Sequence, residues 1–207
     1  ELVVALNASP YHQQKWRERQ AVVAERVRAS GRAMLYANLV GGQDELVFDG
    51  ASFAVDAQGA LAWQGPFFAE AEAVLEWREG SWQPHAPCFD PLPPEEELYR
   101  ALVLGVRDYL GKNGFPGAII GLSGGIDSAL TLCLAVDALG PERVRAVMLP
   151  SPYTATMSLE DAATLAARLG VRYDVIPIEP AMNTFSAMLE PFFAGWPPDT
   201  TEENLQS

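Results

Sequence analysis

The first part of the chain combines short apolar runs with one long stretch of helical spacing. Residues 2–6 form a β-rich apolar run, and residues 12–30 repeat apolar positions with the period of an amphipathic helix. This spacing places one group inward, Trp16, Val22, Val23 and Val27, and another outward, Lys15, Arg17, Arg19 and Arg26. Further strands are predicted over 34–39, 52–55, 60–63 and 72–77, and the turn at 56–59 joins the middle two as a β-hairpin. A helix followed by antiparallel strands is typical of an α+β layered domain.

The second part alternates strands and helices. It begins with a helix over 95–111, whose first turn carries three acidic residues at the positive end of the helix dipole. The predicted strands are 117–122, 143–149 and 171–178, and the predicted helices are 126–139, 158–169 and 180–193. Strands that are apolar throughout and alternate with helices indicate a parallel sheet covered on both faces.

A proline-rich stretch separates the two parts. Residues 83–94 contain five prolines in twelve positions, which predicts a stiff, extended linker. We therefore expect one domain over 1–82 and a second over 95–207. The chain opens without an initiator Met or a signal sequence and closes on what reads as a helix start, so we expect a fragment.

Charge and composition narrow the classes of partner. The chain has 27 acidic and 14 basic residues, a net charge of −13, which disfavours a broad basic face for nucleic acid or an anionic membrane. No apolar stretch approaches the ~20 residues that span a bilayer. We therefore expect neither nucleic acid nor a membrane as partner. The two cysteines, Cys88 and Cys133, and the two histidines form no spacing typical of a zinc site.

A glycine-rich loop stands between the predicted strand 117–122 and the predicted helix 126–139. Its sequence is Ser123-Gly124-Gly125-Ile126-Asp127-Ser128. Two adjacent glycines let backbone N–H groups approach an anion at a helix N-terminus, and the serines add hydroxyl donors. The Gly-Lys-Ser/Thr ending of a Walker A loop is absent. The alternative interpretation is a tight strand-to-helix turn that is merely rich in Gly and Ser.

The carboxylate of Asp127 adds a second piece of evidence on what this loop binds. A carboxylate in the first turn of a helix is favourable for the helix dipole alone, which is the simpler explanation. If the loop binds phosphate, however, the carboxylate would repel it unless a divalent cation lies between them. Mg²⁺ commonly binds through one or two carboxylates together with substrate phosphates. The loop and Asp127 together predict a site for a metal-bound nucleotide.

The loop 123–128 resembles the pyrophosphate loop of the N-type ATP pyrophosphatases, which split ATP between its α- and β-phosphates. Three further blocks, at 148–154, 158–162 and 201–207, resemble glutamine-dependent NAD synthetases. The block 36–50 resembles the nitrilase-type glutaminase domain that precedes the synthetase domain in those enzymes. The resemblance implies an α/β fold: the C-terminal part of a nitrilase-like α-β-β-α layered domain, then a Rossmann-like parallel-sheet ATP pyrophosphatase domain.

The resemblance also implies roles for particular residues. The expected ATP-binding residues are Ser123, Gly124, Gly125, Ile126, Asp127, Ser128, Leu149 and Ser151, with Leu149 and Ser151 beside the adenine and ribose. Asp127 would also hold Mg²⁺. Glu203, or Glu202 in the competing register, would contact deamido-NAD or a metal, and Ser9 would contact glutamine. Simpler explanations stay open: a strand end for Leu149 and Ser151, a turn before Pro10 for Ser9, and an acidic helix start for the two glutamates.

The implied reaction is the ATP-dependent amidation of deamido-NAD to NAD with ammonia from glutamine. It passes through an adenylylated intermediate and releases AMP and pyrophosphate. The resemblance further implies Mg²⁺ as cofactor, a cytoplasmic location and a homo-oligomer. The family's glutaminase Glu, Lys and Cys are expected upstream of Glu1, so this chain contains no glutaminase catalytic residue. Two alternatives stay open: another N-type ATP pyrophosphatase amidotransferase, or an inactive nucleotide-binding fragment.

Overall fold

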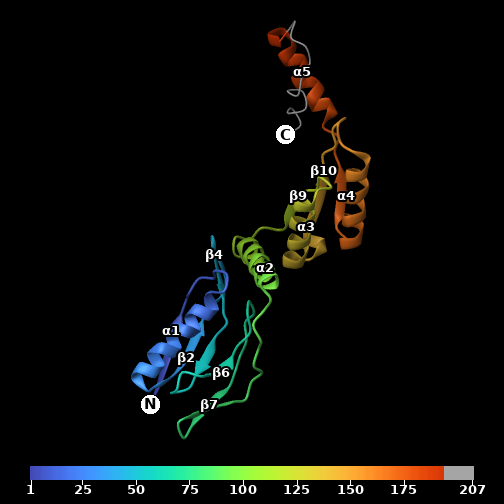
Figure 1. The fold of residues 1–207 in the computed structure, drawn as a ribbon. Helices are drawn as coiled ribbons and strands as arrows, with labels where there is room; N and C mark the ends of the chain where they lie inside the picture. Colours follow the sequence, from blue (N-terminus) through green and yellow to red (C-terminus); the bar gives the residue numbers. More distant parts are fainter. Residues whose placement is uncertain (194–207) are drawn as a thin grey trace. The chain divides into compact units, whose positions relative to one another are not determined.

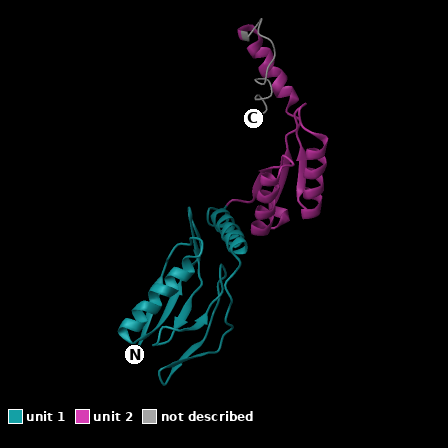
Figure 2. Cartoon of the chain, viewed as in Figure 1, with its two compact units in different colours: residues 1–114 teal, residues 115–207 magenta. Residues whose placement is uncertain are grey.

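The computed structural model describes residues 1–193, and the chain divides into two compact units, Glu1–Gly114 and Phe115–Ser207 (Figures 1 and 2). Each unit is an α/β structure. The helix α2 (Pro94–Lys112) packs on strands of the first unit. The domain boundary at 83–94 stays a prediction. Within the described residues, no helix has the length and apolar character that crossing a bilayer requires.

The first unit is built on a four-stranded sheet in the order β1-β2-β5-β6. The strands are β1 (Leu2–Asn7), β2 (Ala33–Asn38), β5 (Phe53–Val55) and β6 (Leu61–Gln64). β1 and β2 are parallel, as a crossover through helix α1 (Lys15–Ser30) requires, and the remaining pairs are antiparallel. The predicted strands and hairpin of this part are confirmed.

The buried face of α1 differs from its prediction at two positions. Trp16, Val23 and Val27 are buried as expected, but Val22 is 55% exposed and Arg19 is only 7% exposed. The buried stripe follows i, i+3, i+4 spacing, and Arg19 falls on this stripe whereas Val22 lies beside it. The prediction placed Arg19 outward because of its charge, and that charge is neutralised inside the unit by Asp49.

Two hairpins were only partly expected. The strands β3 (Val40–Gln43) and β4 (Leu46–Asp49) form one hairpin, and β7 (Leu75–Arg78) and β8 (Ser81–Pro84) form the other. The sequence pattern predicts β7 alone. β3 lacks an apolar alternation because its centre is Gly41-Gly42, and both glycines are buried against α2.

The contact between β3 and α2 explains these glycines. A Cβ at Gly42 would lie 3.1 Å from Asp108 Cβ and 3.3 Å from Gly105 Cα, so a side chain would hold the helix away. The Gly42 N–H donates to Asp108 Oδ2 at 2.8 Å, and Lys112 Nζ donates to the Gly42 carbonyl. A strand whose backbone is bound by helix side chains leaves little signal in its own sequence.

The second unit holds a parallel three-stranded sheet in the order β11-β10-β9. Its strands are β9 (Ala118–Gly121), β10 (Val144–Met148) and β11 (Arg172–Val175), and its helices are α3 (Ile126–Leu139), η1 (Pro141–Arg143), α4 (Thr156–Leu169) and α5 (Glu179–Phe193). This confirms the predicted alternation and the parallel sheet.

One face of this sheet is open within the described residues. Ile119 pairs with Arg145, and Arg145 pairs with Arg172, so these side chains share one face. Ile119 is 71% exposed, whereas Val144, Ala146 and Met148 of the other face are buried. The prediction that both faces are covered is therefore not confirmed by residues 115–193.

Candidate functional site

The loop 123–128 lies where β9 ends and α3 begins. Leu122 is buried, and its N–H donates to the Val147 carbonyl of the neighbouring strand at 2.8 Å. The chain is therefore fixed to the sheet immediately before the loop. The loop then stands at the carboxyl end of a parallel strand and at the N-terminus of a helix, where ligands bind in open α/β sheets.

Gly124 brings the loop against the first turn of α4. Its φ is +83°, and a Cβ built there would lie 2.4 Å from the Ser158 carbonyl oxygen and 2.7 Å from Ser158 Cα. Both atoms belong to the backbone, so no side-chain rotation relieves the clash. Only glycine fits here, and the loop is held against α4 as well as α3.

The two serines of the loop close a local hydrogen-bond network. Ser128 Oγ donates to the Gly125 carbonyl at 3.0 Å and lies 3.0 Å from Ser123 Oγ. The N–H groups of Ser123 and Gly125 donate to serine hydroxyls, at 3.2 Å and 3.3 Å. These bonds are exposed to solvent. An oxyanion at the loop can therefore take the place of a hydroxyl as acceptor for both N–H groups, and the serines then become donors to it.

Asp127 presents an unengaged carboxylate in the first turn of α3. Its side chain is exposed, and within residues 1–193 it forms no hydrogen bond or ion pair. Its main-chain carbonyl accepts from Thr131 Oγ1 at 2.9 Å. The described residues contain no cluster of three His, Cys, Asp or Glu side chains that could hold a metal. A single carboxylate fits Mg²⁺ that completes its shell with phosphate oxygens and water.

Leu149 and Ser151 follow β10, the strand beside β9, and therefore lie at the same edge of the sheet as the loop. Leu149 is 52% exposed, as are many large apolar side chains of this chain, so its side chain is accessible at this edge. The Ser151 N–H donates to Thr154 Oγ1 at 2.9 Å, and the Tyr153 N–H donates to Ser151 Oγ at 3.2 Å. Thr154 belongs to the block 148–154 and was assigned no role of its own, although its Ser-x-x-Thr spacing is a signal for this kind of turn. Glu202 and Glu203 lie outside the described residues.

Ser9, the predicted glutamine contact, belongs to the first unit. Its N–H donates to Asn38 Oδ1 at 2.8 Å, and its carbonyl accepts from Asn38 Nδ2 at 3.3 Å. Its hydroxyl has no hydrogen-bond partner in the described part of the chain. The backbone of Ser9 is therefore satisfied by protein while its side chain stays available.

A buried ion pair lies behind Asn38. Arg19 Nη2 and Asp49 Oδ2 are 2.5 Å apart, and their side chains are 6% and 1% exposed. Burial raises the pKa of Asp49, and the hydrogen bond from Arg19 opposes that rise. Burial also raises the pKa of Tyr11 to about 12, with added repulsion from Glu97 and Asp49. Asn38 and Asp49 belong to the block 36–50 and were assigned no role of their own. The available signals were a polar residue at the end of a predicted strand and an arginine within an apolar helical stripe.

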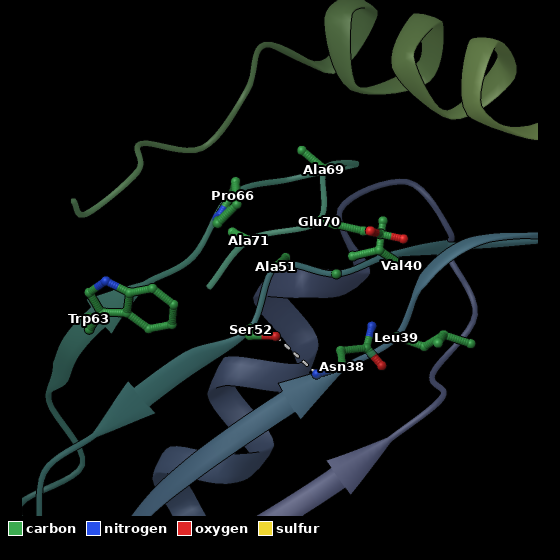
Figure 3. A pocket seen from close by; sticks show the side chains of 11 residues that line it. Asn38, Leu39, Val40, Ala51, Ser52, Trp63, Pro66, Ala69, Glu70 and Ala71 are labelled. Atoms are coloured by element: carbon green, nitrogen blue, oxygen red, sulfur yellow. Dashed lines mark hydrogen bonds between the residues drawn. The ribbon is translucent and has the colours of Figure 1, made fainter. Parts of the chain in front are cut away.

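A pocket of about 290 Å³ lies in the first unit, and Asn38 forms part of its wall (Figure 3). The Asn38 N–H donates to Ser52 Oγ at 3.0 Å, and Trp63, Pro66 and Glu70 are among the other residues that line the pocket. None of the predicted site residues lines it. The pocket therefore adds no residue to the predicted binding site.

The whole chain is similar to known proteins. A family model described as NAD synthase matches residues 98–207. Glutamine-dependent NAD(+) synthetases from Acinetobacter baylyi and Xanthomonas campestris pv. campestris are 44% and 49% identical to it, over 211 and 210 residues. Each alignment covers 100% of this chain and 38% of the relative, so the chain spans well under half the length of these relatives.

Two solved structures show the same fold. The chain matches the glutamine-dependent NAD+ synthetase of Acinetobacter baumannii, solved in complex with adenosine diphosphate, with a TM-score of 0.92 and 44% identity. The match covers 100% of this chain and 39% of that one. The glutamine-dependent NAD(+) synthetase of Cytophaga hutchinsonii matches over 98% of this chain with a TM-score of 0.77, and at 19% identity it supports the fold alone.

Proposed function

The chain belongs to the NAD synthase family, and we propose on that premise that its full-length protein makes NAD from deamido-NAD, ATP and glutamine. One observation supports this most: the backbone of the loop 123–128 is pressed against α4 at Gly124, beside the unengaged carboxylate of Asp127. That combination suits a nucleotide whose phosphates carry a cation. The named relatives, which this chain resembles along its whole length, are glutamine-dependent NAD synthetases.

The chemistry requires activation of a carboxylate. The acceptor carboxylate of deamido-NAD is a poor acylating agent because oxide would be its leaving group. Attack of that carboxylate on the α-phosphate of ATP breaks the α–β bond, releases pyrophosphate and forms an acyl-adenylate. Ammonia then attacks the acyl carbon, and AMP leaves with the bonding electron pair. The amide of NAD is the product.

The loop supplies donors for the phosphate part of this reaction. In our proposal, the N–H groups of Ser123, Gly124 and Gly125 and the hydroxyls of Ser123 and Ser128 donate to phosphate oxygens. Such preorganised donors stabilise charge that develops on departing pyrophosphate. Asp127 would hold Mg²⁺, which when bound neutralises phosphate charge. Because the carboxylate already faces solvent, no protein contact has to break for this.

Other residues keep the roles that the family resemblance implies. Leu149 and Ser151 would flank the adenosine, at the same sheet edge as the loop. Glu203, or Glu202, would contact deamido-NAD or a metal. Ile126, 80% exposed at the start of α3, would cover the bound nucleotide.

The first unit has a separate task in this proposal. Residues 1–82 would form the C-terminal part of a nitrilase-like glutaminase, with Ser9 at the amino-acid end of glutamine. Ammonia must reach the acyl-adenylate unprotonated, since ammonium has no lone pair for the attack. A sheltered route from the glutaminase would provide this. Cytoplasmic location and a homo-oligomeric assembly, both implied by the resemblance, belong to the same proposal.

An assay on the full-length protein tests the proposal. With Mg·ATP, deamido-NAD and either glutamine or ammonium chloride, we expect NAD, AMP and pyrophosphate in equal amounts. Release of ADP and phosphate would contradict cleavage at the α–β bond. Amidation of xanthosine monophosphate or aspartate in place of deamido-NAD would instead support another amidotransferase of the same superfamily.

A further inference from the structure

The Asn38 amide binds the backbone of Ser9 from both sides. Oδ1 accepts from the Ser9 N–H at 2.8 Å, and Nδ2 donates to the Ser9 carbonyl at 3.3 Å. One planar side chain therefore satisfies both main-chain groups of a single residue. Because the two residues are 29 positions apart, this contact fixes a turn through tertiary structure rather than through local sequence.

The orientation of that amide is set by Asp49. Asp49 Oδ1 accepts from Asn38 Nδ2 at 3.2 Å, and an ionised carboxylate can only accept. The amide nitrogen must therefore face Asp49, which turns the amide oxygen to the Ser9 N–H. A flipped amide would place two acceptors together and two donors together.

Arg19 in turn pairs with Asp49 inside the unit and favours its ionised form, against the rise in the pKa of Asp49 that burial causes. It donates Nη2 to Asp49 at 2.5 Å and Nη1 to the Gly50 carbonyl at 3.4 Å. Both side chains are nearly inaccessible, so the pair is shielded from solvent. The order of contacts runs from Arg19 through Asp49 and Asn38 to Ser9.

Neighbouring backbone bonds hold the ends of the same segment. The Leu39 N–H donates to the Asn7 carbonyl at 2.9 Å, and the Tyr11 N–H donates to the Val47 carbonyl at 2.7 Å. Asn38 binds the backbone of Ser9, which lies between Asn7 and Tyr11. The segment 7–11 is thus fixed at its start, middle and end. Three of its side-chain groups have no hydrogen-bond partner among the described residues: the Ser9 hydroxyl, Asn7 Nδ2 and the Tyr11 hydroxyl.

We propose that Asn38 is a positioning residue for glutamine: it holds Ser9 in the conformation whose hydroxyl receives the amino-acid end of the substrate, and Asp49 and Arg19 fix its amide. The proposal rests on the function proposed above. It predicts a defect in glutamine use that leaves the ammonia-dependent reaction intact, because free ammonia bypasses the Ser9 segment.

The test is Asn38→Asp in the full-length protein. The new side chain has the same shape, cannot donate to Ser9 and places a second carboxylate beside Asp49. We expect the KM for glutamine to rise about tenfold to a hundredfold, as for loss of hydrogen bonds that are oriented by a charged group. The kcat/KM for ammonia should stay within about twofold of wild type. Asn113→Asp makes the same chemical change at the exposed C-cap of α2, where it removes the hydrogen bond from Nδ2 to the Tyr109 carbonyl; as the matched control it should alter neither value.

A double variant that exchanges the side chains of Asn38 and Asp49, called the swapped pair, distinguishes a loss of positioning from simple misfolding. Asn38→Asp combined with Asp49→Asn restores one donor–acceptor pair between the two side chains and leaves one carboxylate in the cluster instead of two, with an amide oxygen at position 49 that can still accept from Arg19. We expect it to recover part of the lost affinity for glutamine. Thermal unfolding of each variant shows whether its folded state persists.

The outcomes separate the two proposals. If wild type makes no NAD from deamido-NAD with ammonia, the proposed function fails. If wild type is active but Asn38→Asp keeps the wild-type KM for glutamine, the positioning role is wrong. Equal loss of glutamine- and ammonia-dependent activity, or a swapped pair no better than the single variant, would also overturn it.

Discussion

Replacing Gly124 by alanine tests whether the backbone of the loop must lie against α4. Two costs add at this position. Alanine at a φ of +83° costs about 1–2 kcal/mol. Its Cβ would also lie 2.4 Å from the Ser158 carbonyl oxygen, about 1 Å inside an ordinary contact, and such overpacking costs about 1–3 kcal/mol.

The loop can relieve the clash with Ser158 only by moving away from α4. If about 2–3 kcal/mol of the total reappears as lost affinity for ATP, the KM for ATP rises roughly 30- to 150-fold. The assay is ammonia-dependent NAD synthesis by the full-length protein at varied Mg·ATP. Ammonia is used so that the glutaminase does not influence the result.

Gly170 provides the matched control for this variant. It has a φ of +68° at the end of α4, and a Cβ there would meet nothing within 4 Å. Gly170→Ala therefore carries the backbone strain without the clash, and we expect lower thermal stability with an ATP KM near that of wild type. A wild-type KM for ATP in Gly124→Ala would refute the reasoning, as would equal effects of the two variants.

Three further predictions concern charged side chains. Asp127→Asn should lower Mg·ATP turnover by orders of magnitude with unchanged circular dichroism; wild-type-like amidation would contradict the metal assignment. Arg19→Met leaves Asp49 buried without its cation and should cost about 3–5 kcal/mol in urea unfolding, against little for an exposed arginine of the same helix. The hydrogen bond from Arg145 lowers the pKa of Asp174 below its usual 3.8, so this pairing stabilises the fold above that pH and is lost as pH falls. Asp174→Asn should therefore unfold more easily than wild type at pH 7, and the difference should shrink toward pH 2.

Apolar periodicity predicts most elements of this fold because the core itself imposes that periodicity. The helix α3 occupies 126–139 as predicted, since a continuous apolar stretch follows the loop and Gly140 ends it. The strand β3 escapes prediction because its glycines are selected by a helix more than sixty positions later, where Asp108 binds the Gly42 N–H. Non-local selection of this kind leaves no local pattern.

The candidate site also contains residues that the local sequence can identify and residues whose surroundings depend on contacts distant in the sequence. Ser123, Asp127 and Ser128 can be chosen as candidates from the sequence because they lie within one six-residue loop between a predicted strand and a predicted helix; their roles stay a prediction. The burial of Arg19 was not, because a charged residue on a helix is ordinarily solvated and only its contact with Asp49 reverses that preference. The role that we propose for Asn38 likewise depends on its contact with Ser9, which is 29 positions away in the sequence.

In both units, hydrogen bonds within the protein hold the backbone beside a polar side-chain group that has no hydrogen-bond partner among the described residues. In the first, Asn38 satisfies the backbone of Ser9 and leaves the hydroxyl without a partner. In the second, the serines satisfy the N–H groups of the loop, while Asp127 keeps an unengaged carboxylate. Holding the backbone rigid before binding removes part of the entropy cost of ordering it later. In the proposed function both groups are accessible to a ligand without the loss of a protein hydrogen bond, and Asp127 in addition interacts favourably with the dipole of α3.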